Sequence, residues 1–313
     1  MSIYLVTGAA GFIGSNIVEE LVARGENVRA LDNLSTGKMS NLAPFMSRID
    51  FIEGSLLDSD LLSTVVSGVD YILHQAALPS VPRSVSDPLK SHEANATGTL
   101  KLLIAARDNG RVKRIVYASS SSVYGDSPTL PKREDMPTNP LSPYAVNKLA
   151  AEQYCRVFTR VYGLPTVALR YFNVFGPRQD PNSQYAAVIP AFTASVLAGN
   201  RPTIYGDGTQ SRDFTFVKNV VLANLLACET DAADGEAVNI ACGERTSLLD
   251  LMTGINGILG ANVEPQFQEA RTGDVKHSLA DIGKATRLLG YKPFVSFRDG
   301  LAATVRALQD ERS

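Results

Sequence analysis

Near the start of the chain stands Thr7-Gly8-Ala9-Ala10-Gly11-Phe12-Ile13-Gly14, a glycine-rich stretch that follows a short apolar run and opens a helical pattern. Glycine at position 8 permits a tight turn, Gly11 lets backbone N–H groups approach a pyrophosphate, and Gly14 lets the helix pack closely on the strand. The positive end of the helix then stabilises phosphate charge. The stretch therefore predicts a strand–turn–helix unit that binds a dinucleotide.

The first half of the chain repeats this alternation of strand and helix. Runs such as Tyr71–Gln75 are apolar at successive positions, which is typical of strands buried on both faces of a parallel sheet. Right-handed crossovers between such strands give an α/β fold, a doubly wound parallel sheet of the Rossmann type. We predict strands at Ile3–Thr7, Asn27–Asp32, Asp50–Glu53, Tyr71–Gln75, Arg114–Ser119 and Thr166–Tyr171, and helices at Gly11–Arg24, Asp58–Ser67, Pro88–Asn109 and Pro143–Tyr162.

After residue 172 the alternation loosens, which indicates a second, smaller unit. We predict a Rossmann domain at 1–172 with 213–241, and a smaller C-terminal substrate-binding domain at 173–212 with 242–313. Helical patterns in this half lie at Ala187–Ala198, Val217–Cys228, Ser247–Leu259 and Gly300–Gln309, and a strand pattern lies at Ala237–Ala241.

Composition narrows the class of protein. A formal net charge of -2 gives no strong field for nucleic acid or an anionic membrane, so neither is predicted as a partner. No apolar run approaches the roughly eighteen residues that a membrane-spanning helix needs. The three cysteines, Cys155, Cys228 and Cys242, form no CxxC pair, which predicts neither a disulfide framework nor a metal site. A reducing, cytoplasmic compartment is expected.

Asp32 ends the second predicted strand, at a distance from the glycine loop that suits a ribose contact. A carboxylate there accepts hydrogen bonds from the ribose hydroxyls and repels a 2′-phosphate. No arginine follows it; Asn33, Leu34 and Ser35 do. The sequence therefore favours NAD over NADP as the cofactor.

Tyr144 and Lys148 lie four residues apart on a predicted helix and so share one face. An unperturbed tyrosine titrates near pH 10, which is about three units too high for a base at neutrality. A neighbouring ammonium and an oxidised nicotinamide would both favour the phenolate, which would make Tyr144 a general base. Taken alone, the pair is also compatible with a solvated surface helix.

A run of serines, Ser119-Ser120-Ser121-Ser122, ends the fifth predicted strand and precedes Val123-Tyr124-Gly125. It lies at the carboxyl edge of the sheet, where ligands bind in such folds. A hydroxyl there could bridge the Tyr144 oxygen and a substrate hydroxyl. The alternative is that one or two of these serines only cap a loop.

The glycine spacing and Tyr144-Ala145-Val146-Asn147-Lys148 together resemble the extended branch of the short-chain dehydrogenase/reductase superfamily. From Gly8 to Ser278 the chain is similar to UDP-sugar 4-epimerases, above all to the UDP-N-acetylglucosamine 4-epimerases of bacterial polysaccharide pathways. The resembling stretches are His74–Ala77, Ser80–Ser84, Arg170–Gly176, Tyr185–Pro190 and Arg271–Asp274.

This resemblance implies roles for individual residues. Ser120, Tyr144 and Lys148 would be catalytic; Asn173, Arg212 and Arg271 would hold the UDP diphosphate. The implied NAD-binding residues are Gly8, Gly11, Phe12, Ile13, Gly14, Asp32, Asn33, Ser35, Ser55, Leu56, Ala76, Ala77, Asn95, Tyr144, Lys148 and Tyr171. The implied substrate-binding residues are Ser80, Ser120, Ser121, Ser122, Tyr144, Asn173, Val188, Thr203, Tyr205, Arg212, Arg271, Asp274 and Ser278.

The resemblance also implies a reaction. Dehydratases of this branch carry a carboxylate in the triplet before the Tyr-Gly pair, where this chain has Ser120, Ser121 and Ser122. The chain is therefore expected to oxidise and re-reduce C4 of a UDP-sugar without eliminating water, which is a 4-epimerase reaction. Open alternatives are a sugar-nucleotide 4-reductase, an epimerase of UDP-galactose alone, and an inactive relative that binds NAD as a regulator or scaffold.

Three positions bear on specificity and affinity. Ser278 stands where UDP-galactose 4-epimerases have a bulky Tyr that excludes N-acetyl groups, so the resemblance implies that acetylated sugars are substrates. Ser55 replaces an Asp that pairs with the adenine amino group, and Pro79 replaces a Lys found in some relatives. The helices predicted at 88–109 and 143–162 form the dimer interface of the branch, so a homodimer is expected.

Overall fold

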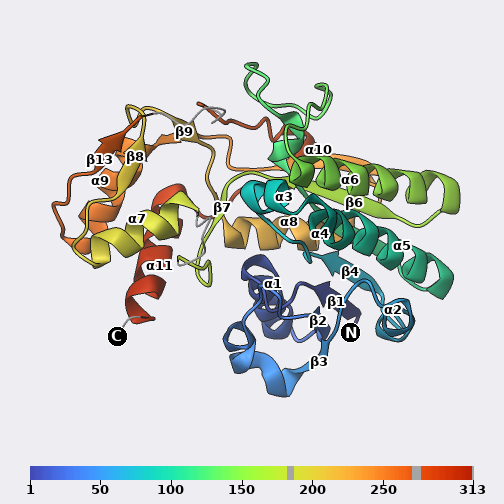
Figure 1. Ribbon diagram of the computed structural model, residues 1–313. Helices are drawn as coiled ribbons and strands as arrows, with labels where there is room; N and C mark the ends of the chain where they lie inside the picture. The colour runs from blue at the N-terminus through green and yellow to red at the C-terminus, as the bar shows by residue number, and fades with distance from the viewer. Residues whose placement is uncertain (182–186, 270–275, 312–313) are drawn as a thin grey trace.

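A seven-stranded sheet forms the centre of the computed structural model, which describes residues 1–181, 187–269 and 276–311 (Figure 1). Its order is β11-β6-β5-β4-β1-β2-β3, and every neighbouring pair is parallel. The order reverses between β1 and β4, which places a ligand crevice at their carboxyl ends. The strands are β1 (Ile3–Thr7), β2 (Asn27–Asp32), β3 (Ile49–Glu53), β4 (Tyr71–His74), β5 (Arg114–Ser120), β6 (Thr166–Tyr171) and β11 (Glu236–Ile240).

Helices cover both faces of this sheet, which confirms the doubly wound α/β prediction. Alternate residues of one strand enter opposite cores: Val116 packs with α1 and α8, whereas Ile115 and Tyr117 pack with α5 and α6. This explains the uninterrupted apolar runs in the sequence. One face carries α1 (Phe12–Ala23), α8 (Val217–Glu229) and α10 (Gly283–Leu289); the other carries α2 (Ser59–Val65), α5 (Gly98–Asn109) and α6 (Pro143–Tyr162).

A separate hydrophobic core lies beside the sheet, on the left of Figure 1. Its centre includes Phe175, Phe192 and Ile204, together with Phe214 and Phe216 from the segment that leads back into α8. In the described ranges, no helix is long and apolar enough to cross a membrane. The elements here are α7 (Val188–Leu197), α9 (Leu248–Leu259), α11 (Phe297–Asp310) and the strand pairs β8 (Thr203–Tyr205) with β13 (Gln266–Gln268), β7 (Val174–Phe175) with β10 (Thr215–Phe216), and β9 (Ser211–Arg212) with β12 (Thr246–Ser247).

The predicted helix Pro88–Asn109 is wrong as a single element. It divides into α4 (Pro88–His92), a π-helical turn at Glu93–Thr97, and α5. The extra residue of a π turn presents Asn95, whose side-chain amide donates to the Leu78 carbonyl at 3.1 Å and accepts from the Leu78 N–H at 2.8 Å. Short elements were also not predicted: α3 (Val81–Ser86), α10, and 3₁₀ turns at Met39–Asn41, Ala43–Arg48 and Ser121–Tyr124.

Helix α1 packs very closely against the glycine loop. A Cβ at Gly14 would lie 2.1 Å from the Gly8 carbonyl oxygen, a backbone atom that cannot rotate away. We expect Gly14→Ala to lower the free energy of unfolding by on the order of 2 kcal/mol through overpacking. Because it distorts the loop, the variant should also retain less dinucleotide, measured by calorimetry and by absorbance of the purified protein.

Gly257→Ala is the matched control. Gly257 is an exposed glycine of α9, and nothing lies within 4 Å of a Cβ built there. This variant should gain about 0.5–1 kcal/mol from the better helix propensity of alanine. A Gly14→Ala protein that melts with the wild type would show that the contact does not constrain the loop.

Candidate active site

The carboxyl ends of the strands open into a groove of about 740 Å³ beside the glycine loop. Of the residues expected to bind cofactor, all but one line it; Asn95 does not, since its side chain instead holds Leu78 in the groove wall. Ser80 of the expected substrate residues also lines the groove. The expected cofactor residues found there are Gly8, Gly11, Phe12, Ile13, Gly14, Asp32, Asn33, Ser35, Ser55, Leu56, Ala76, Ala77, Tyr144, Lys148 and Tyr171.

The glycine loop has the shape that a pyrophosphate needs. Gly8 has a φ of +66°, and a Cβ there would lie 2.7 Å from the Cα of Ala76. Gly11 caps α1 in an extended conformation, and no side chain caps the helix. The first N–H groups of α1 therefore face the groove without a side-chain acceptor, which suits a bound diphosphate.

Asp32 is placed to hold a ribose. One carboxylate oxygen accepts from the Ala10 N–H at 2.9 Å, and the other accepts from the Leu34 N–H at 2.8 Å. Burial raises the pKa of this carboxyl, while the hydrogen bonds from Leu34 and Ala10 lower it. Each oxygen keeps a further acceptor site for a hydroxyl. At the adenine end, the Ser55 hydroxyl accepts from the Leu57 N–H at 3.2 Å and so serves its own turn.

The three residues expected to be catalytic come together from β5 and α6. Tyr144, in the first turn of α6, borders the groove, and its side chain is hydrogen-bonded to Ser120. Its backbone N–H donates to the Ser84 hydroxyl at 3.0 Å. Lys148 donates to the Ala118 carbonyl at 2.8 Å, and its Nζ lies 5.9 Å from the centre of the Tyr144 ring.

The protein groups alone do not make this phenol acidic, which differs from the sequence-based expectation. Burial raises the pKa of Tyr144 to about 12, and the hydrogen bond with Ser120 opposes that rise. Burial also lowers the pKa of Lys148 to about 7, since a desolvated ammonium is costly. A positive nicotinamide is therefore the further charge that the phenolate needs.

The serines that follow β5 leave a hydroxyl available to a ligand. The Ser122 N–H donates to the Ser120 oxygen at 3.2 Å. The Ser122 hydroxyl is buried and has no hydrogen-bond partner among the described residues. Buried hydroxyls are normally paired, so a ligand group is a suitable partner for it.

Asn173 and Ser278 meet at the other end of the site. The Asn173 amide donates to the Asp213 carbonyl at 3.1 Å and to the Ser278 oxygen at 3.0 Å. Both of its N–H donors are thus engaged, so this arrangement leaves no donor for the diphosphate role that the resemblance implied. The Ser278 oxygen also accepts from the Asp213 N–H at 3.3 Å, which leaves its own O–H to donate.

The residues expected near uracil and phosphate lie outside the groove. Val188 begins α7, Thr203 begins β8 and Tyr205 ends it. The Thr203 hydroxyl accepts from the Gln266 side chain at 2.7 Å. Arg212 donates to the carbonyls of Ser211 and Lys276. Tyr185, Arg271 and Asp274 lie outside the described residues.

Sequence reasoning missed four cations that line the groove. Lys38 forms an ion pair with Asp180 at 3.3 Å across it. Arg83 lies inside one of the resembling stretches and Arg178 lies two residues after another, so the resemblance could have indicated both. No sequence signal pointed to Lys38 or Lys90. In the described part of the chain, no group of three or more His, Cys, Asp or Glu could hold a metal ion. The cations are Lys38, Arg83, Lys90 and Arg178.

Tyr144→Phe removes one oxygen at the centre of the site. We expect kcat to fall by on the order of 10³-fold, since general-base catalysis contributes about 10²–10⁴. Bound dinucleotide should stay near the wild-type amount. Tyr117→Phe is the control, because the Tyr117 hydroxyl is buried without a partner among the described residues and its ring lies 5.0 Å from the same ammonium. Equal activity of the two variants would remove Tyr144 from the mechanism.

A family model and a curated relative both relate this chain to epimerases. The model of a family described as NAD dependent epimerase/dehydratase matches residues 4–241. A UDP-glucose 4-epimerase of Mycolicibacterium smegmatis is 41% identical over 311 residues, which is 98% of each chain.

Two solved structures show the same fold over nearly the full length. The UDP-N-acetylglucosamine 4-epimerase of Methanobrevibacter ruminantium M1, in complex with UDP-N-acetylmuramic acid, is 43% identical with a TM-score of 0.95 and covers 99% of both chains. The UDP-glucose 4-epimerase of Thermus thermophilus, in complex with NAD, is 36% identical with a TM-score of 0.87; 98% of this chain and 99% of that chain are covered.

Proposed function

The chain belongs to the NAD-dependent epimerase/dehydratase family and is an NAD-dependent UDP-sugar 4-epimerase, and we propose that its substrates are UDP-N-acetylglucosamine and UDP-N-acetylgalactosamine. The observation that carries the substrate proposal is the small hydroxyl side chain at Ser278, with its O–H left to donate. The carboxylate-free triplet of Ser120, Ser121 and Ser122 supports epimerisation over dehydration.

The protein's part in the reaction is proton transfer at the sugar's 4-hydroxyl. Bound NAD supplies a hydride acceptor that is restored in each cycle and so is not consumed. The Tyr144 oxygen removes the proton from the 4-hydroxyl, and Ser120 holds that oxygen by a hydrogen bond. After the resulting 4-keto sugar has turned over in the site, Tyr144 returns the proton. Lys148 is fixed beside Tyr144 by the Ala118 carbonyl.

Ser278 is proposed as the residue that admits the acetyl group. Serine leaves room at the C2 substituent, and the free O–H suits the acetamido carbonyl. The similar enzyme of Methanobrevibacter ruminantium M1 is named for UDP-N-acetylglucosamine and was solved with an N-acetylated UDP-sugar, which supports the proposal.

Ser278→Tyr should separate the two kinds of substrate. We expect kcat/KM for the acetylated pair to fall by about 100-fold or more, because an unrelieved clash exceeds the roughly 1–3 kcal/mol that one pocket group contributes. UDP-galactose should lose about threefold or less. Product chromatography without added NADH measures both.

Ser278→Ala is the control, since it keeps the room and removes only the hydroxyl. A neutral hydrogen bond contributes about 1 kcal/mol, so the acetylated substrates should lose about fivefold. A wild-type enzyme that turns over UDP-galactose but not UDP-N-acetylgalactosamine would contradict the substrate proposal.

One second candidate has support of its own. Two similar proteins are named UDP-glucose 4-epimerases, which favours UDP-glucose and UDP-galactose as a further or sole pair. A 4-reductase would consume reduced cofactor with each turnover, so a measured net loss of NADH during turnover would favour that reaction and contradict epimerisation. We also propose the domain division 1–172 with 213–241 for cofactor and 173–212 with 242–313 for substrate, and a cytoplasmic location.

We propose that two copies of the chain pair through α5 and α6. On α6, Val146, Val157 and Val161 are 49%, 45% and 65% exposed, although the opposite face of the helix is buried. Ile104 on α5 is 37% exposed. These positions form one outward apolar stripe at helical spacing, and a second copy would cover it in a four-helix arrangement.

Val157→Glu tests this interface. A charge in the middle of a buried apolar stripe is costly, so we expect the protein to change from dimer to monomer in light scattering at micromolar concentration. Phe294→Glu makes the same kind of change at a 63% exposed site outside the stripe and should stay dimeric. A monomeric wild type at that concentration would reject the proposal.

A further inference from the structure

Three adjacent strands carry polar side chains at one level, just below the active-site edge of the sheet. In the strand register Ser119 of β5 pairs with Arg170 of β6, and Arg170 pairs with Asn239 of β11. Their exposed fractions are 3%, 4% and 0%. A row of buried polar groups costs free energy unless every member is hydrogen-bonded.

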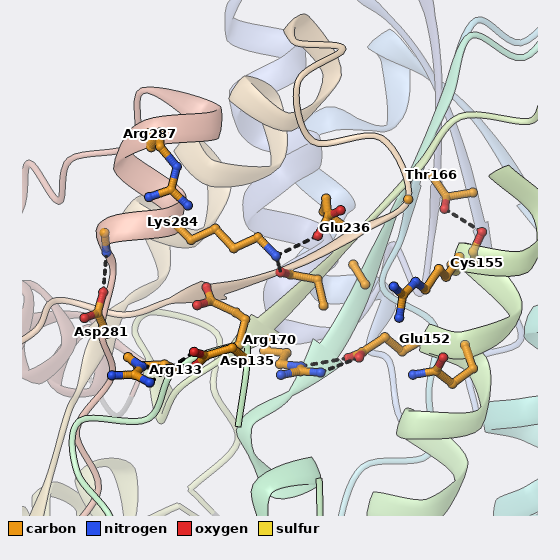
Figure 2. A pocket seen from close by; sticks show the side chains of 17 residues that line it. Arg133, Asp135, Glu152, Cys155, Thr166, Arg170, Glu236, Asp281, Lys284 and Arg287 are labelled. Carbon is orange, nitrogen blue, oxygen red and sulfur yellow. Dashed lines mark hydrogen bonds and ion pairs between the residues drawn. The ribbon is translucent and has the colours of Figure 1, made fainter. Parts of the chain in front are cut away.

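Glu152 satisfies two members of this row. It follows Tyr144 and Lys148 at four-residue spacing, so all three lie on the face of α6 that meets β5 and β6. One oxygen of Glu152 accepts from the Ser119 hydroxyl at 2.8 Å and from the Arg170 Nε at 3.0 Å; the second accepts from Arg170 Nη2. Glu152 and Arg170 line a cavity of about 790 Å³. Figure 2 shows their side chains pointing toward each other.

The row continues to the turn that follows Ser120. Arg170 Nη1 donates to the Tyr124 oxygen at 2.8 Å, and the Tyr124 hydroxyl donates to the Asn239 side chain at 2.7 Å. Tyr124 is the last residue of the 3₁₀ turn at Ser121–Tyr124. The chain is thus held immediately before Ser120 and again four residues after it.

We propose that Glu152 is a positioning residue, which fixes the Ser120 hydroxyl against Tyr144 by holding Ser119 directly and Tyr124 through Arg170. The inference deepens the proposed function and rests on it. Stability alone is a weak reason for such a pair, because a buried ion pair loses about as much in desolvation as it gains in attraction. Unlike apolar packing, this network fixes Ser119 and Tyr124 by directed hydrogen bonds, on either side of Ser120 in the chain.

A double-mutant cycle tests the coupling with Ser120→Ala, Glu152→Gln and the double variant. We expect Glu152→Gln alone to lower kcat by about tenfold, with KM for the UDP-sugar within about twofold, because the substrate still binds but the Tyr144–Ser120 contact is lost. In the Ser120→Ala background, Glu152→Gln should lower kcat no further, since effects that act through one contact are not additive.

The proposal would be overturned by multiplicative losses in the double variant, by a rise in KM with unchanged kcat, or by unchanged kcat in Glu152→Gln. If Glu152→Gln does not fold, Ser119→Ala removes only the hydroxyl and leaves the ion pair, and it must show the same non-additivity with Ser120→Ala. A wild type without epimerase activity would instead contradict the proposed function, which the cycle does not confuse with a failure of the coupling.

Asp234→Asn is the matched control, since it weakens a buried arginine contact at the opposite end of the same strand. Arg114 begins β5, is 3% exposed, and donates to Asp234 at 2.8 Å. This variant should lose thermal stability while kcat stays within about twofold, because independent sites do not couple. An equal fall of kcat in Asp234→Asn would reduce the Glu152 effect to general destabilisation and overturn the proposal.

Discussion

The hydrogen bond between Tyr144 and Ser120 is the contact on which the rest of the active site depends. Among the described residues, it is the interaction that lowers the pKa of this phenol against the effect of burial. Its two partners come from different elements, the end of β5 and the start of α6, so their separation is set by how that helix docks on the sheet. Lys148, one helical turn after Tyr144, donates to the Ala118 carbonyl and so holds α6 against β5.

On the proposed substrate side of the site, several segments of the chain are hydrogen-bonded to one residue, Asp213. Asp213 is fully buried, and its carboxylate accepts from the N–H groups of Cys242, Gly243 and Ala280. Its main chain binds Asn173 and Ser278. Burial raises the pKa of Asp213 to about 6, and the three backbone donors oppose that rise. Three segments of the chain, around residues 213, 242–243 and 280, are therefore held together by one carboxylate, and the main chain of the same residue binds the serine proposed to admit the acetyl group.

Local patterns predicted the parts of the fold that local physics decides. The bounds of β1, β2 and β6 and of α6 were right, because apolar runs, Pro143 at the helix start and Gly163 after its end are local signals. The π turn at Asn95 was not predictable from local patterns, since the hydrogen bond that Asn95 makes there joins it to Leu78, 17 residues away. The same holds for Asn173, whose donors are used by Asp213 and Ser278, and for the pKa of Lys148, which follows from burial rather than from its spacing to Tyr144.

The serine triplet after β5 has an electrostatic consequence beyond the lack of an eliminating acid. Positions 121 and 122 directly follow Ser120, the hydrogen-bond partner of Tyr144, so a carboxylate there would add a negative charge to the same turn. A like charge favours the neutral phenol and would raise its pKa further. That phenol already stands at about 12 through burial. Neutral hydroxyls can bind a sugar by hydrogen bonds without raising this pKa. Serines in the triplet therefore supply no carboxyl group for elimination and also leave the pKa of Tyr144 no higher than burial makes it. If the triplet acts as proposed, the same three side chains bear on both the choice of reaction and the strength of the base.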